Sequence, residues 1–351
     1  MNGLSTSPGT VVKEQRGGRP VTVYIADSVK LERVLASAEG AGVRIQVADR
    51  GSNRLIVELD EPSLQILKKK QATFEVEIGQ AVYILPIDAI DLNGIIRQAD
   101  GGTEPGNLLI QIEVSLPSAA DVLKLETAAA EGRFELLASP VEFAVRVVSG
   151  GAAHQVSKFN FYVERLIEIP EGGDENALTT GIAMDEDGSV RHVPTKQIDA
   201  GGKRYAKISS VTNSLYAIVS HSVKFSDTAG HWGEAEMNEM GSRMVVNGSG
   251  GLFSPDRQVT RAEFAAMLVR GLGLRPEEGT EPFSDIKETS WYAGAVNTAH
   301  AYGIIGGFED GTFRPHERMT REQAMVMIAR AMSLTGLKAA QTDGADASVA
   351  F

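Results

Sequence analysis

The sequence predicts a multidomain protein with an N-terminal α+β region, a small antiparallel β module and a C-terminal all-α region of helix-loop-helix repeats. Its 351 residues exceed what one hydrophobic core usually organises. Residues 20–158 mix the apolar periods of strands and helices, whereas only strand patterns occur from there to residue 222. From about Phe225 onward the chain resembles itself at an offset of 60 residues.

The α+β region, residues 20–158, opens with a strand that leads into a helix. Val21, Val23 and Ile25 alternate as in a strand, and Asp27 or Ser28 is placed to cap the helix that follows. Further strands are predicted at residues 55–59, 74–78, 110–116 and 141–147, with helices opening near residue 60 and over 119–130. Residues 1–19 are polar and contain Gly and Pro, so we expect a flexible leader there.

The β module, residues 159–222, carries no helical pattern. Asp187-Gly188, a dipeptide that favours the tight turn of a hairpin, lies between residues 182–184 and 190–193. We therefore expect a small antiparallel module that leads into the repeats.

The C-terminal region contains two repeats, residues 223–276 and 281–338. The offset of 60 residues superposes Gly251 on Gly311, Phe253 on Phe313 and Pro255 on Pro315. Each repeat is predicted to form a short helix bearing its Trp, a Gly-rich loop and a second helix that starts at Thr260 or Thr320. Both second helices begin with a capping box, in which the Thr and the side chain three residues later exchange hydrogen bonds with backbone N–H groups.

Arg261 and Arg321, at the first positions of these second helices, are candidate ligand-binding residues. A cation there opposes the helix dipole, so helix formation does not explain it. A guanidinium beside free N–H groups would bind an anion well. A structural salt bridge is the alternative interpretation of both arginines.

The tryptophans and glycines of the repeats have two interpretations as well. Trp232 and Trp291 either pack into a core or stack on the apolar faces of sugars. Gly306 and Gly307 either permit turns or let a ligand approach the backbone. Asp227 and Asp285 precede the first helices of the two repeats.

Composition and motifs argue against several classes of function. The net charge of −12 disfavours nucleic acid as a partner, and no apolar run approaches the roughly 20 residues needed to insert into a membrane. The absence of Cys and the dispersed His residues give no metal or cofactor site. The motifs of metalloproteases, α/β-hydrolases and phosphate-binding loops are absent, so we expect no enzyme.

These repeats resemble the S-layer homology (SLH) family. The resemblance rests on Phe-Ser-Asp followed by a Trp, on the run from Gly303 to Pro315 and on Met-Thr-Arg-Glu at 319–322, and it covers about a third of the chain. It implies a bundle of three repeats that bind a pyruvylated secondary cell-wall polysaccharide attached to peptidoglycan. The residues that it implicates here are Arg261, Arg321, Trp232, Trp291, Asp227, Asp285, Gly306 and Gly307.

The chain departs from that family pattern in two ways. The first repeat has Arg243–Gly250 where the second has the Gly-rich run, so its loop is degenerate. A third repeat is missing, and Phe351 falls where its Phe-x-Asp would begin, so residues 339–351 are interpreted as a linker and the start of a truncated third repeat. The first residues contain no signal peptide, so we expect a fragment or a mature form.

The sequence thus predicts a non-covalent anchor of a surface protein, located outside the cell on a Gram-positive type cell wall or in its S-layer. Two rival interpretations remain. Residues 20–220 could form a cell-envelope glycan hydrolase, or the chain could be an S-layer or adhesin subunit that self-associates.

Overall fold

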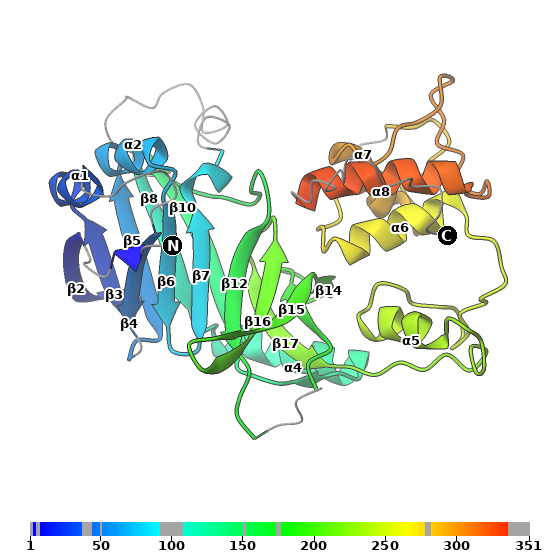
Figure 1. The fold of residues 1–351 in the computed structure, drawn as a ribbon, viewed down its shortest axis with the longest axis horizontal. Helices are drawn as coiled ribbons and strands as arrows, with labels where there is room; N and C mark the ends of the chain where they lie inside the picture. The colour runs from blue at the N-terminus through cyan, green and yellow to red at the C-terminus, as the bar shows by residue number, and fades with distance from the viewer. Residues whose placement is uncertain are drawn as a thin grey trace, which may run out of the picture. The chain divides into compact units, whose positions relative to one another are not determined.

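The computed structural model describes residues 3–4, 8–36, 44–49, 51–91, 108–149, 152–172, 177–277 and 282–335. The chain forms two compact units (Figure 1). The first comprises residues up to Arg257 together with Arg270–Arg275, and the second comprises Gln258–Val269 and the residues from Pro276 onward. The expected linker at 339–351 lies outside the described residues.

Two β-sheets build the first unit (Figure 1). Among the described residues, one sheet has the strand order β1-β4-β6-β7-β12-β16-β15. Its strands are β1 (Gly3–Leu4), β4 (Arg44–Asp49), β6 (Thr73–Ile78), β7 (Ala81–Pro86), β12 (Val163–Glu168), β15 (Thr195–Ala200) and β16 (Lys203–Ser210).

The other sheet has the order β14-β13-β17-β10-β8-β5-β3-β2, with β9 on β17 and β11 on β10. Its strands are β2 (Gly9–Arg16), β3 (Arg19–Ala26), β5 (Arg54–Asp60), β8 (Leu109–Ser115), β9 (Glu135–Leu136), β10 (Val141–Ser149), β11 (Ala152–Gln155), β13 (Thr180–Met184), β14 (Val190–Val193) and β17 (Leu215–Ser220). Parallel pairs join β3 to β5 and β4 to β6, because a helix lies in each connection.

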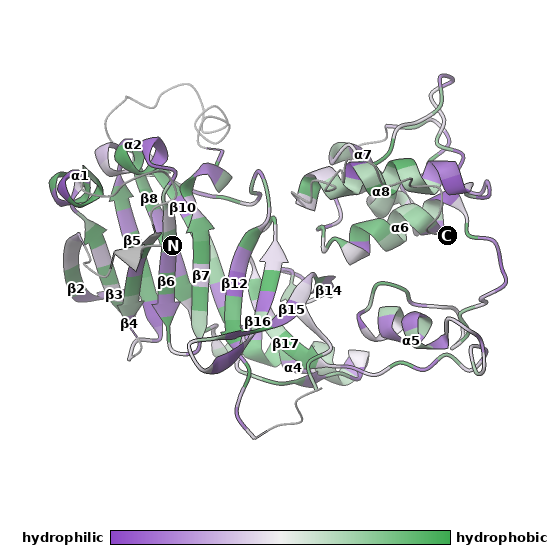
Figure 2. Cartoon of the chain, in the orientation of Figure 1, coloured by the Kyte–Doolittle hydropathy of each residue, from purple (hydrophilic) through white to green (hydrophobic). Residues whose placement is uncertain are grey.

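One hydrophobic core lies between the two sheets and is closed at one end by helices α1 (Ser28–Ala36) and α2 (Glu61–Lys69). Figure 2 shows hydrophobic residues along most of these strands, including β7. Asp27 and Asp60 cap the two helices by accepting hydrogen bonds from the N–H groups of Lys30 and Ser63, at 3.0 and 2.9 Å. A short 3-10 helix, Ile87–Ala89, follows β7.

Helix α4 (Ala119–Gly132) covers the outer face of the larger sheet near β13 and β17. It forms a second buried cluster with these strands, in which Leu125 of the helix lies with Ile182 and Ala217. Elsewhere that outer face carries a small apolar cluster of Val21, Val23 and Ile56 and several ion pairs, with Glu113 held by both Arg54 and Arg146 at 2.7 and 2.6 Å.

The sheets correct two boundaries expected from the sequence. Strand β12 pairs with β7 and strand β17 pairs with β10, so residues 20–158 and 159–222 share both sheets and one core. The expected leader, residues 1–19, contains the edge strand β2, which pairs with β3 along its whole length. Gly17 and Gly18, with φ of 60° and 73°, make the tight turn of this hairpin, a signal that the sequence contained.

Residues 270–275, hereafter the strap, are held within the first unit by Tyr162, which precedes β12, by Asp185 and by Arg191 of β14. The Tyr162 hydroxyl donates to the Leu272 carbonyl at 2.7 Å, and Arg191 donates to the Gly273 carbonyl at 2.8 Å. Asp185 pairs with Arg275 at 3.1 Å and with Arg191 at 3.4 Å. The strap is therefore fastened by both side-chain and backbone contacts.

The N-terminal part is built of mixed sheets, and helices dominate the C-terminal repeats, as the sequence predicted. They are α5 (Glu234–Ser242), α6 (Arg261–Gly271), α7 (Ala293–Ala301) and α8 (Arg321–Thr335). The first-unit residues include α5 and the last two residues of α6. Both predicted capping boxes form, since Thr260 exchanges bonds with Glu263 and Thr320 with Gln323. No helix of the described residues is long and apolar enough to cross a membrane.

Candidate functional site

An aspartate braces the loop between the two helices of each repeat. The Asp285 carboxylate accepts hydrogen bonds from the N–H groups of Phe313 and Arg314, at 2.8 and 2.7 Å. Arg314 has a φ of 59°, in the left-handed region, so these bonds hold a conformation that a side-chain-bearing residue seldom adopts. The predicted residue Asp285 therefore shapes the loop.

The first repeat uses the same device. Asp227 accepts the N–H groups of Phe253 and Ser254, at 2.8 and 2.7 Å, and Ser254 has a φ of 62°. The hydrogen bond from Phe253 lowers the pKa of Asp227 most, and the bond from Ser254 lowers it further. The two repeats thus share a loop geometry as well as a sequence pattern.

Arg261 lies buried in the second unit against the loop that Asp285 braces. Its side chain is 6% exposed, and its Nε donates to the Phe313 carbonyl at 2.8 Å. Its guanidinium carbon lies 4.7 Å from the centre of the Phe313 ring and 4.8 Å from that of Phe308. Burial lowers the pKa of Arg261, but an arginine keeps its charge at any pH at which the protein folds.

The first N–H groups of α6 do not form the anion site that we considered. The N–H groups of Arg261 and Ala262 donate to the carbonyls of Glu317 and Pro315, at 2.9 and 3.0 Å. Any anion at this place would therefore be bound by the guanidinium of Arg261 and not by the helix terminus.

A groove of about 240 Å³ opens beside Arg261 within the second unit. Ile305 and Gly306 line it from the loop, and one face of α8 lines it with side chains spaced three to four residues apart. The lining residues from α8 are Glu322, Gln323, Val326, Met327 and Arg330. The groove therefore combines two cations, polar groups and an apolar patch.

Sequence reasoning missed the side chains that α8 contributes. The repeat itself contained a signal for Arg330, because the offset of 60 residues superposes Arg270 on it. The spacing of Gln323, Met327 and Arg330 places them on one helical face, but the sequence alone does not say what that face meets.

The structure brings only part of the predicted set together. Arg261 and Gly306 line the groove. Gly307 is packed instead, since a Cβ there would lie 2.5 Å from the Phe283 ring. Arg321 is exposed at the start of α8.

The two tryptophans are exposed and not part of a core. Trp291 is 63% exposed and contacts Tyr292 edge to face, and Trp232, in the first unit, is 92% exposed beside His231. Neither is among the described residues that line the groove. Both rings are accessible for stacking.

Metal chemistry finds no support in the described parts of the chain. No group of three or more His, Cys, Asp or Glu side chains lies close enough together there to hold a metal ion.

Comparison with known proteins shows the family of the two C-terminal repeats, which supply most of the residues that line the groove. The family model for the S-layer homology domain matches residues 224–265 and 282–325. The chain is 38% identical over 95 residues to a surface layer protein of Brevibacillus choshinensis, covering 25% of this chain and 8% of the relative. It is 49% identical over 65 residues to an S-layer-related protein of Niallia circulans, covering 18% and 4%.

Enzymes are also among the relatives. The chain is 35% identical over 141 residues to an amylopullulanase of Thermoanaerobacterium thermosulfurigenes, covering 38% of this chain and 8% of that protein. The chain therefore spans less than a tenth of the length of each of these three relatives.

Proposed function

Because residues 224–325 carry an S-layer homology domain, we propose that the chain anchors a surface protein non-covalently to the bacterial cell wall, outside the cell. The ligand in this proposal is an anionic secondary wall polysaccharide, such as one with pyruvylated amino sugars. The groove beside Arg261 would bind one acidic sugar residue of that polymer.

The state of Arg261 supports this proposal most directly. Its Nε is bound to the Phe313 carbonyl, whereas its two terminal nitrogens have no hydrogen bond or ion pair with any described residue. A buried guanidinium without a carboxylate partner is costly, and a ligand carboxylate would complete its hydrogen bonds in a bidentate geometry. Aromatic rings at 4.7 and 4.8 Å fix the orientation of the cation before a ligand arrives.

The rest of the groove suits a substituted sugar. Gly306 exposes its backbone, since only the Arg330 side chain lies near the position where a Cβ would be, at 3.7 Å. Val326 and Met327 offer an apolar surface for a methyl group or a sugar face. Gln323 and Glu322 can bind hydroxyl groups.

Because the polymer repeats, further residues of the chain would contact neighbouring sugars and increase the overall affinity. We include Arg321 and the exposed rings of Trp291 and Trp232 in the proposal, as weak contacts with neighbouring sugars. Asp227, Asp285 and Gly307 would act by shaping the loops. Several weak contacts on one chain raise retention by effective concentration without any tight single site.

The proposal is tested by co-sedimentation with purified wall sacculi, before and after chemical removal of the secondary polysaccharide. We expect the intact chain to sediment with untreated sacculi only. Arg261→Ala and Arg330→Ala should each weaken binding on the order of tenfold. Arg33→Ala, which removes an exposed cation from α1, serves as the matched control. Equal binding of all variants, or binding that survives removal of the polymer, would refute the proposal.

The activities named for the enzymes among the relatives are not transferred to this chain, because it covers only a small part of each of those proteins. We propose binding and not catalysis for this chain, and the release of reducing sugars from sacculi by the purified protein would overturn that. Self-association, the remaining alternative, would appear as a rise in molar mass with concentration.

A further inference from the structure

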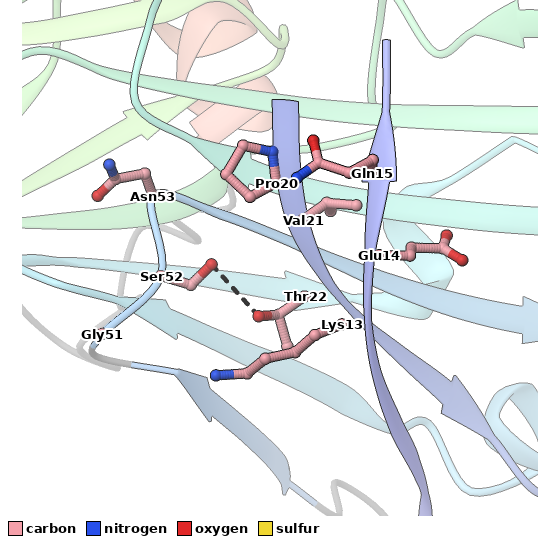
Figure 3. A pocket seen from close by; sticks show the side chains of 9 residues that line it. All are labelled: Lys13, Glu14, Gln15, Pro20, Val21, Thr22, Gly51, Ser52 and Asn53. Atoms are coloured by element: carbon pink, nitrogen blue, oxygen red, sulfur yellow. Dashed lines mark hydrogen bonds between the residues drawn. The ribbon is translucent and has the colours of Figure 1, made fainter. Parts of the chain in front are cut away.

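A second cleft, of about 410 Å³, lies in the first unit beside the β2–β3 hairpin (Figure 3). Lys13 and Gln15 line it from β2, Thr22 lines it from β3, and Ser52 and Asn53 line it from the turn that precedes β5. Figure 3 shows the Lys13 side chain extending past Thr22 toward this turn. The volume falls in the range of about 300 to 1,000 Å³ that is typical of small-molecule sites.

The inner part of the cleft is held rigidly by hydrogen bonds. The Thr22 hydroxyl, in a residue that is 4% exposed, donates to Asp49 Oδ2 at 2.7 Å and lies 3.3 Å from Ser52 Oγ. The other carboxylate oxygen of Asp49 accepts the Gly51 N–H at 3.1 Å. The Ser52 hydroxyl donates to the Arg54 carbonyl at 2.8 Å. The turn therefore keeps its shape without a ligand.

Three polar side chains around the opening form no hydrogen bond or ion pair with the described residues. Within the described residues, no hydrogen bond or ion pair engages the Lys13 ammonium or the side-chain amides of Gln15 and Asn53. Glu14 also lines the cleft, but it is paired with Arg16. Lys13 therefore contributes a positive charge that forms no ion pair with any residue the structure describes.

We propose that this cleft binds a hydroxyl-rich ligand of sugar size that carries one acidic group. The Lys13 ammonium and the side-chain amides of Gln15 and Asn53 supply donors and acceptors for hydroxyl groups, and Lys13 selects the acidic group. No aromatic side chain is among the described lining residues, so binding depends on hydrogen bonds and is weak. Such a ligand can come from the wall polysaccharide or from another acidic glycan.

The test is a titration of the full-length, ¹⁵N-labelled protein followed by amide chemical shifts. With glucuronate we expect saturable shifts confined to residues 13–22 and 51–53, and with glucose an affinity on the order of tenfold lower. Lys13→Ala should abolish this difference between the two sugars. Asn53→Ala should weaken the binding of both, and Lys196→Ala, an exposed lysine on edge strand β15, should change neither.

Two further titrations distinguish the wall polysaccharide from other glycans as the ligand, and binding at this cleft from binding at the groove beside Arg261. Fragments of purified wall polysaccharide that shift residues 13–22 in Arg261→Ala would identify the wall as the source, whereas glucuronate binding alone would indicate another glycan. Because Arg261 lies in the other unit, failure of the wall-anchor proposal would leave this titration intact. An absence of saturable shifts at these residues, or shifts that are unchanged in Lys13→Ala, would overturn the inference.

Discussion

Arg261 is bound to Phe313 twice, through Nε to the carbonyl oxygen at 2.8 Å and through its guanidinium to the ring at 4.7 Å. The arginine is therefore a structural element of the loop as well as a candidate ligand contact. Arg261→Lys retains the charge but loses both the Nε bond and the planar stacking. We expect it to lower the free energy of unfolding by about 2 kcal/mol, measured by urea denaturation. Arg33→Lys on exposed α1 should have no effect, and an equal effect of both would contradict this role.

The neighbouring glycines Gly306 and Gly307 should separate binding from stability. A Cβ at Gly306 meets only the Arg330 side chain at 3.7 Å, so Gly306→Ala should fold normally and narrow the groove. A Cβ at Gly307 would lie 2.5 Å from the Phe283 ring and 2.8 Å from the Thr312 carbonyl, so Gly307→Ala should unfold at a lower temperature.

Thermal melts and sacculus binding, measured on the same preparations, check this pair. Loss of binding at an unchanged melting temperature is the expected result for Gly306→Ala. If that variant bound as well as the unaltered protein, the groove would not be the contact surface.

The aspartates that brace the loops should be needed for stability. Asp285→Ala leaves the N–H groups of Phe313 and Arg314 without their acceptor, and we expect a loss of about 2 to 4 kcal/mol. Asp227→Ala should cost less, because its hydrogen bonds are exposed to solvent, which can replace the lost acceptor. Urea denaturation of both variants measures the order, and a larger loss for Asp227→Ala would contradict the explanation by burial.

His192 should make the first unit sensitive to acid. Burial, and next the charge of Arg243, lower its pKa from 6.5 to about 4. The unfolded chain therefore binds more protons between these values, so the stability from neutral His192 is complete above about pH 6.5 and is lost as the pH falls toward 4. The full loss is about 3 kcal/mol.

Urea denaturation at intervals from pH 7 to pH 4 measures this dependence. His192→Asn should remove most of the slope in that window. A slope that survives in His192→Asn would assign the acid sensitivity to other groups.

The strap should depend on Gly273. This residue has a φ of 63°, and a Cβ on it would lie 2.8 Å from Pro194 Cδ and 3.0 Å from the His192 carbonyl. Gly273→Ala should cost about 2 to 4 kcal/mol, the sum of left-handed strain and overpacking. Gly202→Ala shares the left-handed φ, at 79°, but meets nothing within 4 Å, so it should cost about 1 kcal/mol. Equal losses for the two variants in thermal melts would exclude the packing contribution.

Local signals in the sequence predicted most elements and their caps. The helix predicted to open near residue 60 is α2, and the Thr260 and Thr320 capping boxes form as expected, because such bonds join residues three apart. The pairing of β12 with β7 joins residues some 80 positions apart, and periodicity does not encode the partner of a strand. For this reason the two N-terminal regions could not be recognised as one fold.

The same distinction holds for the candidate site. Arg261 was singled out because a cation at a helix start lacks a helical reason, and it does line the groove. Its burial between Phe308 and Phe313 depends on a loop some 50 residues away, which no local pattern shows. Arg330 was missed because an exposed arginine on a helix is ordinary until its neighbours are known.

The strap has a consequence for gene fusion. The chain enters the second unit at residue 258, returns to the first at 270 and leaves it again at 276. Neither unit is therefore a continuous stretch of sequence. A hybrid gene that takes its anchor from residue 224 onward would carry the strap without Tyr162, Asp185 and Arg191, the side chains that fasten it. Leu274, now 2% exposed, would then face water in the hybrid. Recombination between surface proteins of this type should therefore favour junctions upstream of the sheets over junctions at the edge of the repeats.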